Sequence, residues 1–293
     1  MMDRADIRKP PFTREEMLEE LKEILFVQAS HIAVSLSAEA ADAFIGFEVG
    51  VDWHAATVDR YRELIDLRRF NITSLLECAY DFAFQVGAYW KYGPAEGYDI
   101  EAFERGICDA SYEGSHNPYK LDDSKVRHVI RLAVAREYLD IHKDALRIDQ
   151  LCLLADMSEA SVRNSLSKEG IRTSGKPVRV DNDEARAWLA GRRGFIPTRM
   201  KEMEKRSATE SREYLLSLHP AYESARRIIA ETDLQPEHIA EAAEIAFERL
   251  TAFLEGTVVE TDIRFLKAVG GALGFDVPTF VGKAIQDALR RGA

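Results

Sequence analysis

Apolar residues recur every three or four positions in several stretches of the chain, which is the spacing of one face of a helix. The first stretch follows Thr13 and Glu16, which are separated as in a capping box, where a hydroxyl accepts from a backbone amide and a carboxylate reaches back. Ser74 and Glu77 have the same spacing ahead of an aromatic-rich stretch. Both pairs predict the start of a helix.

Further apolar stripes predict helices later in the chain. One runs through residues 126–134, and another keeps helical spacing through residues 239–253. Strand-like alternation is scarce. Residues 45–51 alternate, but the glycines among them suit a tightly packed helix or a loop equally well, so the pattern leaves this stretch open. We therefore expect an all-α, predominantly helical fold with a small β-hairpin in its central part.

Two changes of composition divide the chain. Glycine, proline and small polar residues interrupt residues 92–121, and a stretch rich in Lys and Glu follows residues 194–198. We therefore expect an acidic helical N-terminal domain over residues 1–120, a central domain over residues 121–200 and a helical C-terminal domain over residues 201–293. No internal sequence repeat is apparent.

The composition is that of a folded protein without membrane spans. The 293 residues are 46% hydrophobic and 30% charged, with a net charge of −11 at pH 7. Such a chain can fill more than one core, which excludes disorder of the whole chain. Charged residues interrupt every apolar run before it reaches the roughly 20 residues that a membrane span needs. The N-terminal residues lack the apolar centre of a secretory signal, which favours the cytoplasm.

The sequence has no spacing that indicates a metal site, a cofactor or an enzyme. The three cysteines, Cys78, Cys108 and Cys152, are far apart, and none belongs to a CxxC pair. Ser165 and Lys168 match the SxxK spacing of acyl-transferring serine enzymes, but the companion motifs are absent. We expect no cofactor, no metal, no disulfide framework and no catalytic activity.

Charge is distributed unevenly along the chain. Residues 159–206 contain twelve Lys and Arg against seven Asp and Glu, a net charge of +5, whereas the other residues carry −16. The acidity of the whole chain argues against a protein that coats nucleic acid. A basic island in an acidic protein is nevertheless a candidate site for a polyanion. The alternative is a solvated surface that has no partner.

Residues 151–166 lie within this part of the chain and resemble a helix-turn-helix. Leu151 and Leu154 belong to the inner face of the first helix, and Asp156 and Met157 form the turn. Many members of the class have glycine where this chain has Asp156. Aspartate tolerates the left-handed conformation better than most residues, so the turn is sterically acceptable.

The second helix of this resemblance has a segregated polar face. Ser158 is placed to cap it, and the apolar residues that follow lie four positions apart. The resemblance implies that Arg163 donates to guanine, Asn164 pairs with adenine and Glu159 accepts from cytosine in the major groove. The residues of this segment expected at the DNA are Ser158, Glu159, Ser161, Arg163, Asn164 and Lys168.

A basic hairpin and another helix follow. Gly170 suits the end of the second helix, residues 171–180 predict a short hairpin that turns at residues 173–175, and a new helix opens at Asp181. This order of elements resembles the excisionase-like and MerR-like winged domains over roughly residues 140–195. The resemblance implies that cations of the wing and its surroundings contact DNA phosphates: Lys168, Arg172, Lys176, Arg179, Arg192 and Arg193.

An aromatic cluster lies in the N-terminal part of the chain. It consists of Tyr80, Phe82, Phe84, Tyr89, Trp90 and Tyr92. Aromatic walls with few polar groups are typical of a pocket for a small ligand or a partner helix. The alternative is a helical core or a dimer interface. We favour the core, because aromatic residues are common there.

These observations favour a DNA-binding protein, expected to act as a transcriptional regulator on double-stranded DNA. A homodimer that reads two half-sites is expected, because one recognition helix buries little surface. The flanking helical domains are the candidates for dimerisation and for a small-molecule or protein effector. The alternative is a non-enzymatic helical adaptor whose helix-turn-helix does not bind DNA, and the overall acidity, Glu159 and Asp156 favour it.

Overall fold

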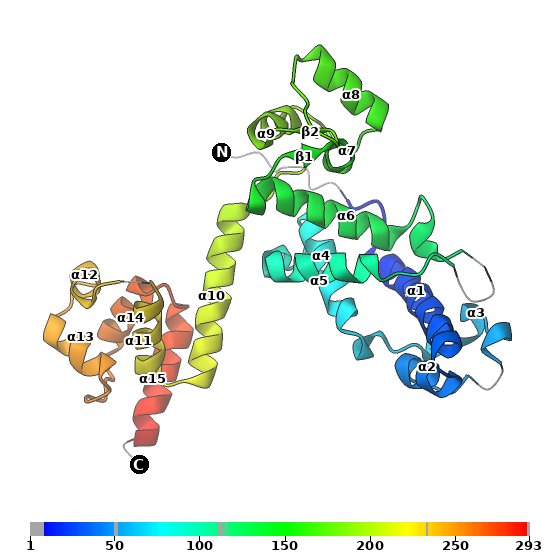
Figure 1. The fold of residues 1–293 in the computed structure, drawn as a ribbon. Helices are drawn as coiled ribbons and strands as arrows, with labels where there is room; N and C mark the ends of the chain where they lie inside the picture. Colours follow the sequence, from blue (N-terminus) through cyan, green and yellow to red (C-terminus); the bar gives the residue numbers. More distant parts are fainter. Residues whose placement is uncertain (1–8, 50–51, 111–113, 115, 233, 292–293) are drawn as a thin grey trace. The chain divides into compact units, whose positions relative to one another are not determined.

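Helices make up most of the structure (Figure 1). The computed structural model describes residues 9–49, 52–110, 114, 116–232 and 234–291, which form fifteen α-helices and a sheet of two short antiparallel strands. The predicted predominance of helix is therefore confirmed. The chain divides into two compact units, Met1–Met200 and Lys201–Ala293.

One of the two predicted capping boxes is confirmed. At the start of α1 (Arg14–Ser35), Oγ1 of Thr13 accepts from the amide of Glu16 at 3.2 Å, and the amide of Thr13 donates to the Glu16 carboxylate at 2.7 Å. The box at Ser74 is wrong, because α4 (Asn71–Phe84) begins a turn earlier. The Ser74 hydroxyl donates to the carbonyl of Asn71 at 2.9 Å, a local bond that lets serine remain inside the helix.

The alternating residues 45–49 do not form a strand. Ile45 is the last residue of α2 (Ala38–Ile45), and Gly46 ends this helix in the left-handed conformation with φ of 99°. Glycine adopts that conformation at no steric cost, so the helix stops there. Gly50 and Val51 lie outside the described residues.

Helix α6 (Lys125–Glu137) joins the parts of the first unit, since it packs against α1, α4, α5 (Pro94–Arg105) and α7 (Ile148–Ala155). Its N-terminus is capped from α1. The Glu20 carboxylate accepts from the Ser124 hydroxyl at 2.6 Å and from the amides of Lys125 and Val126 at 2.9 and 3.0 Å. A carboxylate is favourable there because it meets unpaired amides and the positive end of the helix dipole. Residues on both sides of position 120 thus share one unit.

Replacement of Glu20 is expected to destabilise the first unit. The Glu20→Ala variant loses three acceptor bonds and the charge at the start of α6, so we expect the free energy of unfolding to fall by about 2–3 kcal/mol. Urea unfolding followed by circular dichroism measures the change. Glu19→Ala is the matched control, because Glu19 is exposed and, among the described residues, its carboxylate pairs with Lys22 three residues on and caps no helix. Equal losses in the two variants would contradict this account of α6.

The other elements of the first unit are short. They comprise the α-helices α3 (Val58–Tyr61), α8 (Glu159–Lys168) and α9 (Asn182–Ala190), the strands β1 (Leu146–Arg147) and β2 (Arg179–Val180), a π-helical turn at Tyr138–His142, and 3-10 helices at Trp53–Ala55, Arg62–Leu64, Leu67–Arg69, Tyr89–Lys91 and Pro118–Lys120.

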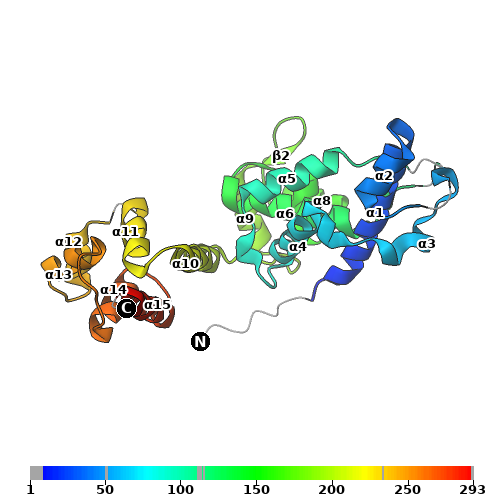
Figure 2. The ribbon, with the colours of Figure 1, turned by 90° about the horizontal axis from the view of Figure 1, so that it is seen from below.

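The second unit has a core of its own. Leu250, Leu266 and Phe280 are fully buried in this core. Figure 2 shows the helices of the unit packed together. Helix α10 (Met200–Leu218) leads into this unit. The others are α11 (Ala221–Thr232), α12 (Pro236–Ala242), α13 (Phe247–Leu254), α14 (Ile263–Ala272) and α15 (Val277–Arg291).

The stripe over residues 239–253 is two helices, where the sequence pattern predicts one. Helix α12 ends before Glu244, which is left-handed with φ of 53°, and α13 begins at Phe247. Ile239 and Leu250 are both buried in the same core. The apolar spacing continues through the turn because both helices face that core, so periodicity alone does not reveal the break.

Candidate nucleic-acid interface

Helices α7 and α8 are joined by a tight turn of three residues. Asp156 ends α7 in the left-handed conformation with φ of 53°, and the amide of Met157 donates to the carbonyl of Cys152 at 3.0 Å. Ser158 caps α8, since its hydroxyl accepts from the amide of Ser161 at 3.3 Å. The predicted places of Asp156 in the turn and of Ser158 at the cap are confirmed by this geometry.

The two faces of α8 differ completely in exposure. Val162 and Leu166 are 0% and 2% exposed, and the inner residues of α7, Leu151 and Leu154, are buried as well. The opposite face of α8 is polar and in solvent, and it carries the residues predicted from the sequence: Glu159, Ser161, Arg163, Asn164, Ser167 and Lys168. The sequence pattern therefore identified which side of this helix is free.

Arg163 does not stand alone on that face. Its Nε donates to the carboxylate of Glu159 one turn earlier at 2.7 Å. Both side chains are about half exposed or more, at 49% and 61%, so the pair contributes only a few tenths of a kcal/mol. The guanidinium can therefore exchange Glu159 for another acceptor at little cost.

The segment after α8 is a loop closed by a small sheet. Ser174 and Arg179 exchange two backbone hydrogen bonds, at 3.0 and 2.8 Å, and residues 175–178 turn between them. The predicted turn at residues 173–175 is therefore wrong by two residues, because the pairing starts at Ser174 and Gly175 opens the turn with φ of 81°. The main partner of β2 is β1, which precedes α7 and which the sequence did not indicate.

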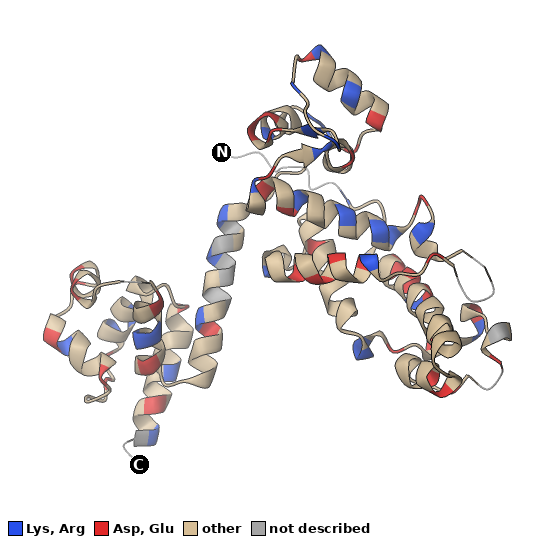
Figure 3. Cartoon of the chain, viewed as in Figure 1, with Lys and Arg blue, Asp and Glu red and all other residues tan. Residues whose placement is uncertain are grey.

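Several cations around α8 and the loop are unpaired. Figure 3 shows Lys and Arg on α8 and on the segment that follows it, and Asp and Glu at the start of α9. The side chains in question are exposed, and within the described part of the chain none of them forms an ion pair: Lys168, Arg172, Lys176, Arg179 and Arg193. Their positive charge is available to an anionic partner.

Arg192 has a different environment from the other predicted cations. Its guanidinium pairs with Glu169, lies 4.4 Å from the centre of the Trp188 ring and is 21% exposed. Hydrogen bonds from Ser165 and Arg192 lower the pKa of Glu169, which keeps that carboxylate ionised at neutral pH. Trp188 also donates to the Ser165 hydroxyl at 3.2 Å. Arg192 thus connects the end of α8 with α9.

The same turn occurs a second time in the chain, between α12 and α13. Glu244 has φ of 53°, as Asp156 has, and the amide of the next residue donates to the carbonyl of Ala240 at 3.0 Å. The surface chemistry differs, because Arg249 is the one cation of α13 and it pairs with Glu260 and Asp262. Three buried positions correspond at a constant separation in sequence: Leu151 with Ile239, Val162 with Leu250, and Leu166 with Leu254.

The aromatic cluster belongs to the core of the first unit. Phe82 and Tyr92 stack in parallel with ring centres 4.3 Å apart, and both are buried. Tyr80, Phe84 and Tyr89 are also at most 5% exposed, whereas Trp90 is half-buried. Five of the six aromatic residues, all except Trp90, are therefore core residues. Phe84 in addition lines a cavity.

Other kinds of site find no support in the described part of the chain. No three His, Cys, Asp or Glu side chains come together there as a metal site would require. The helices described there include none with the length and apolar character of a membrane span. The three cysteines are free thiols.

Comparison of the chain with protein-family models, with curated proteins and with solved structures found no match. The interpretation of the α7–α8 region therefore depends on its own geometry and charge.

Proposed function

We propose that residues 146–190 form a winged helix-turn-helix that binds double-stranded DNA, and that the protein is a transcriptional regulator. The observation that carries this proposal is the division of α8 into two faces. Val162 and Leu166 pack inward, the polar side chains of the opposite face are in solvent, and unpaired cations follow directly in the loop. Helix-turn-helix proteins present a capped second helix of this kind to the major groove.

In this proposal, base contacts come from the polar face of α8. Asn164 is exposed and makes a bidentate contact with adenine, and Arg163 leaves Glu159 to donate to guanine. Glu159 is then free to accept from cytosine. We expect the Asn164→Ala variant to relax the sequence preference at one position of a selected DNA site, whereas wild type retains it.

Phosphate contacts come from the cations that flank α8. Lys168 and Arg193 lie near its end and after α9, and Arg172, Lys176 and Arg179 belong to the loop. Such contacts orient the protein on the duplex and make binding steeply dependent on salt, but they carry no sequence information. Arg192 acts indirectly in this proposal, because Glu169 and Trp188 hold it between α8 and α9.

A dimer follows from the small size of one recognition helix. Tight specific binding generally buries more surface than one such helix supplies, and two half-sites read by a symmetric dimer meet that need. We expect light scattering after gel filtration to give twice the mass of one chain. A monomer at all accessible concentrations would remove the dimer from the proposal, while DNA binding by a single copy would remain testable.

The second candidate function is that of a helical adaptor without a role on DNA. The pair α12–α13 favours it, because this chain uses the same turn where the one cation of the second helix is occupied by Glu260 and Asp262. The turn by itself therefore does not imply nucleic-acid binding. What distinguishes α7–α8 is the set of unpaired cations around it.

The deciding experiment is binding of a fluorescent random-sequence duplex to the full chain at several salt concentrations, followed by anisotropy. The proposal expects binding at low salt that weakens steeply as salt rises. The adaptor predicts no binding even at low salt, and that result would end the proposal.

A further inference from the structure

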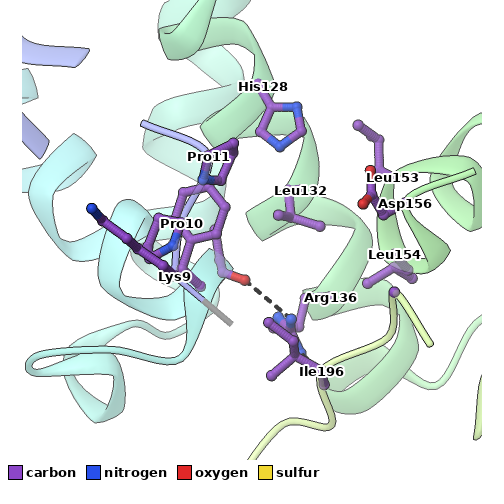
Figure 4. A pocket seen from close by; sticks show the side chains of 13 residues that line it. Lys9, Pro10, Pro11, His128, Leu132, Arg136, Leu153, Leu154, Asp156 and Ile196 are labelled. Atoms are coloured by element: carbon purple, nitrogen blue, oxygen red, sulfur yellow. Dashed lines mark hydrogen bonds between the residues drawn. The ribbon is translucent and has the colours of Figure 1, made fainter. Parts of the chain in front are cut away.

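A cavity lies against the turn that precedes α8. It has a volume of about 210 Å³ and is bounded by residues 9–11, α4, α6, the end of α7 and residues 194–196 (Figure 4). Most of its wall is apolar, from side chains such as Phe84, Leu132 and Ile196. An apolar cavity of about 150 Å³ accommodates benzene, so this one has room for a single ring with a small substituent.

The wall of the cavity includes a buried cation, Arg136 of α6, which is 2% exposed. Its two terminal nitrogens donate to neutral acceptors: the carbonyl of Ile196 at 2.6 Å, the hydroxyl of Thr198 at 2.8 Å and the carbonyl of Ala83 at 3.0 Å. Its Nε is buried and has no hydrogen-bond partner. Within the described residues the guanidinium forms no ion pair.

A buried charge without a counter-ion is costly, and the cost falls when an anion of fitting shape enters. Burial lowers the pKa of Arg136 to about 10, so the side chain is still charged at neutral pH. The Asp140 carboxylate is near enough to raise the pKa of Arg136 in part, but it makes no direct ion pair with that guanidinium and is engaged by Arg186 and Thr198. The cavity therefore combines apolar walls with a positive charge that, among the described residues, has no directly paired carboxylate.

The other titratable groups around the cavity complete its chemistry. His128 stacks on Phe84 with ring centres 6.1 Å apart, and burial lowers its pKa, so the imidazole is neutral at pH 7 and serves as a hydrogen-bonding group. Lys9 and Asp156 are exposed and lie at the rim, with opposite charges. Arg136 is thus the one buried charge among the residues that line the cavity.

We propose that this cavity binds a small organic anion, a carboxylate on a single ring, with the carboxylate beside Arg136 and the ring among Phe84, Leu132 and Ile196. Leu153, Leu154 and Asp156 also line the cavity and belong to the end of α7 and its turn. A bound anion therefore contacts the segment that positions α8. The binding site stands independently, whereas its influence on DNA rests on the proposed function.

Calorimetry on the full chain tests the site, with benzoate, phenylacetate and cyclohexanecarboxylate as probes and benzamide as the neutral counterpart of benzoate. We expect at least one carboxylate to bind with a Kd below 1 mM, and benzoate to bind at least tenfold more tightly than benzamide. Failure of all three carboxylates to bind below 10 mM, or equal binding of benzoate and benzamide, would overturn the proposal.

A variant that fills the cavity tests its location. Ile196→Trp places a large ring in the cavity from an irregular segment and leaves the backbone carbonyl that bonds Arg136 in place, so we expect binding of the carboxylate to fall at least tenfold. Ile72→Trp is the matched control, because Ile72 is half-buried in α4 and does not line the cavity. If the Ile196→Trp variant binds the carboxylate as tightly as wild type does, the proposed location of the site in this cavity is wrong. This test holds even if Arg136 variants fail to fold.

The influence on DNA is measured separately, as duplex affinity with and without saturating benzoate. A change of at least threefold that Ile196→Trp abolishes supports the coupling. If benzoate binds and duplex affinity stays constant, the coupling is wrong and the site stands. If benzoate binds and the protein binds no DNA, the proposed function fails and the site again stands.

Discussion

Replacement of Arg172, Lys176 and Arg179 by alanine is expected to remove most of the salt dependence of DNA binding. Each neutralised phosphate contributes about 0.9 to the slope of log affinity against log salt, so loss of three contacts lowers the slope by about 2.7. The three side chains are exposed and unpaired in the part of the chain that the structure describes. Their removal should change stability by less than about 0.5 kcal/mol.

Anisotropy titrations between about 50 and 200 mM salt measure this slope, where phosphate contacts change affinity most clearly. A matched triple variant removes the same charge from the second unit: Arg226→Ala, Arg264→Ala and Lys267→Ala, all at exposed positions. We expect this control to keep the wild-type slope. Equal weakening in both triple variants would mean that net charge alone attracts DNA, and the loop would lose its assigned role.

The Gly194→Ala variant is expected to disturb the packing behind the α7–α8 turn. A Cβ atom at position 194 would lie 1.9 Å from the carbonyl oxygen of Ala155 and 2.8 Å from Cβ of Asp156. The close neighbour is main chain, so no side-chain rotation relieves the clash and the backbone has to move. We expect the free energy of unfolding to fall by about 1–3 kcal/mol, or more if the turn shifts.

Gly191→Ala is the control for this prediction, since its Cβ would lie 3.5 Å from the nearest atom, the carbonyl oxygen of Trp188. That distance is an ordinary contact, and a change below about 0.5 kcal/mol is expected. Urea unfolding of the two variants beside wild type gives the comparison. If Gly194→Ala and wild type have similar free energies of unfolding, the close packing of Gly194 against Ala155 and Asp156 does not stabilise the turn.

Local signals explain what could be predicted from the sequence. Thr13, Ser158 and Asp181 cap helices through bonds to amides two or three residues away, so short-range spacing suffices to find them. Asp156 tolerates the left-handed conformation, which made the turn after α7 recognisable. The exposed face of α8 followed from helical periodicity, because its two buried residues lie four apart.

Long-range contacts explain what could not be predicted. The carboxylate of Glu20 caps α6 from more than 100 residues away in sequence. Strand β1 pairs with β2, and the helices α7 and α8 lie between these two strands in sequence. Nothing near Glu20 in sequence marks such a role. Arg136 was likewise unremarkable, since the absence of a direct ion pair among the described residues becomes visible only when its neighbours from other segments are in place.

The second helix pair shows a further limit of periodicity. A tertiary core faces both α12 and α13, so the apolar spacing runs through the break at Glu244 without interruption. Glu244 gives no turn signal of the kind that glycine or aspartate gives, so the sequence pattern predicted one helix there. The equivalence of the two turns therefore emerged from backbone geometry.

Hydrogen exchange of the full chain with and without duplex DNA, read by mass spectrometry, tests the central claim most directly. The account predicts that DNA slows exchange in residues 158–180, which cover α8 and the basic loop, and leaves exchange unchanged in residues 236–254, which cover the second helix pair. Protection confined to residues 236–254, or no protection in residues 158–180 at a DNA concentration that saturates binding, would contradict it.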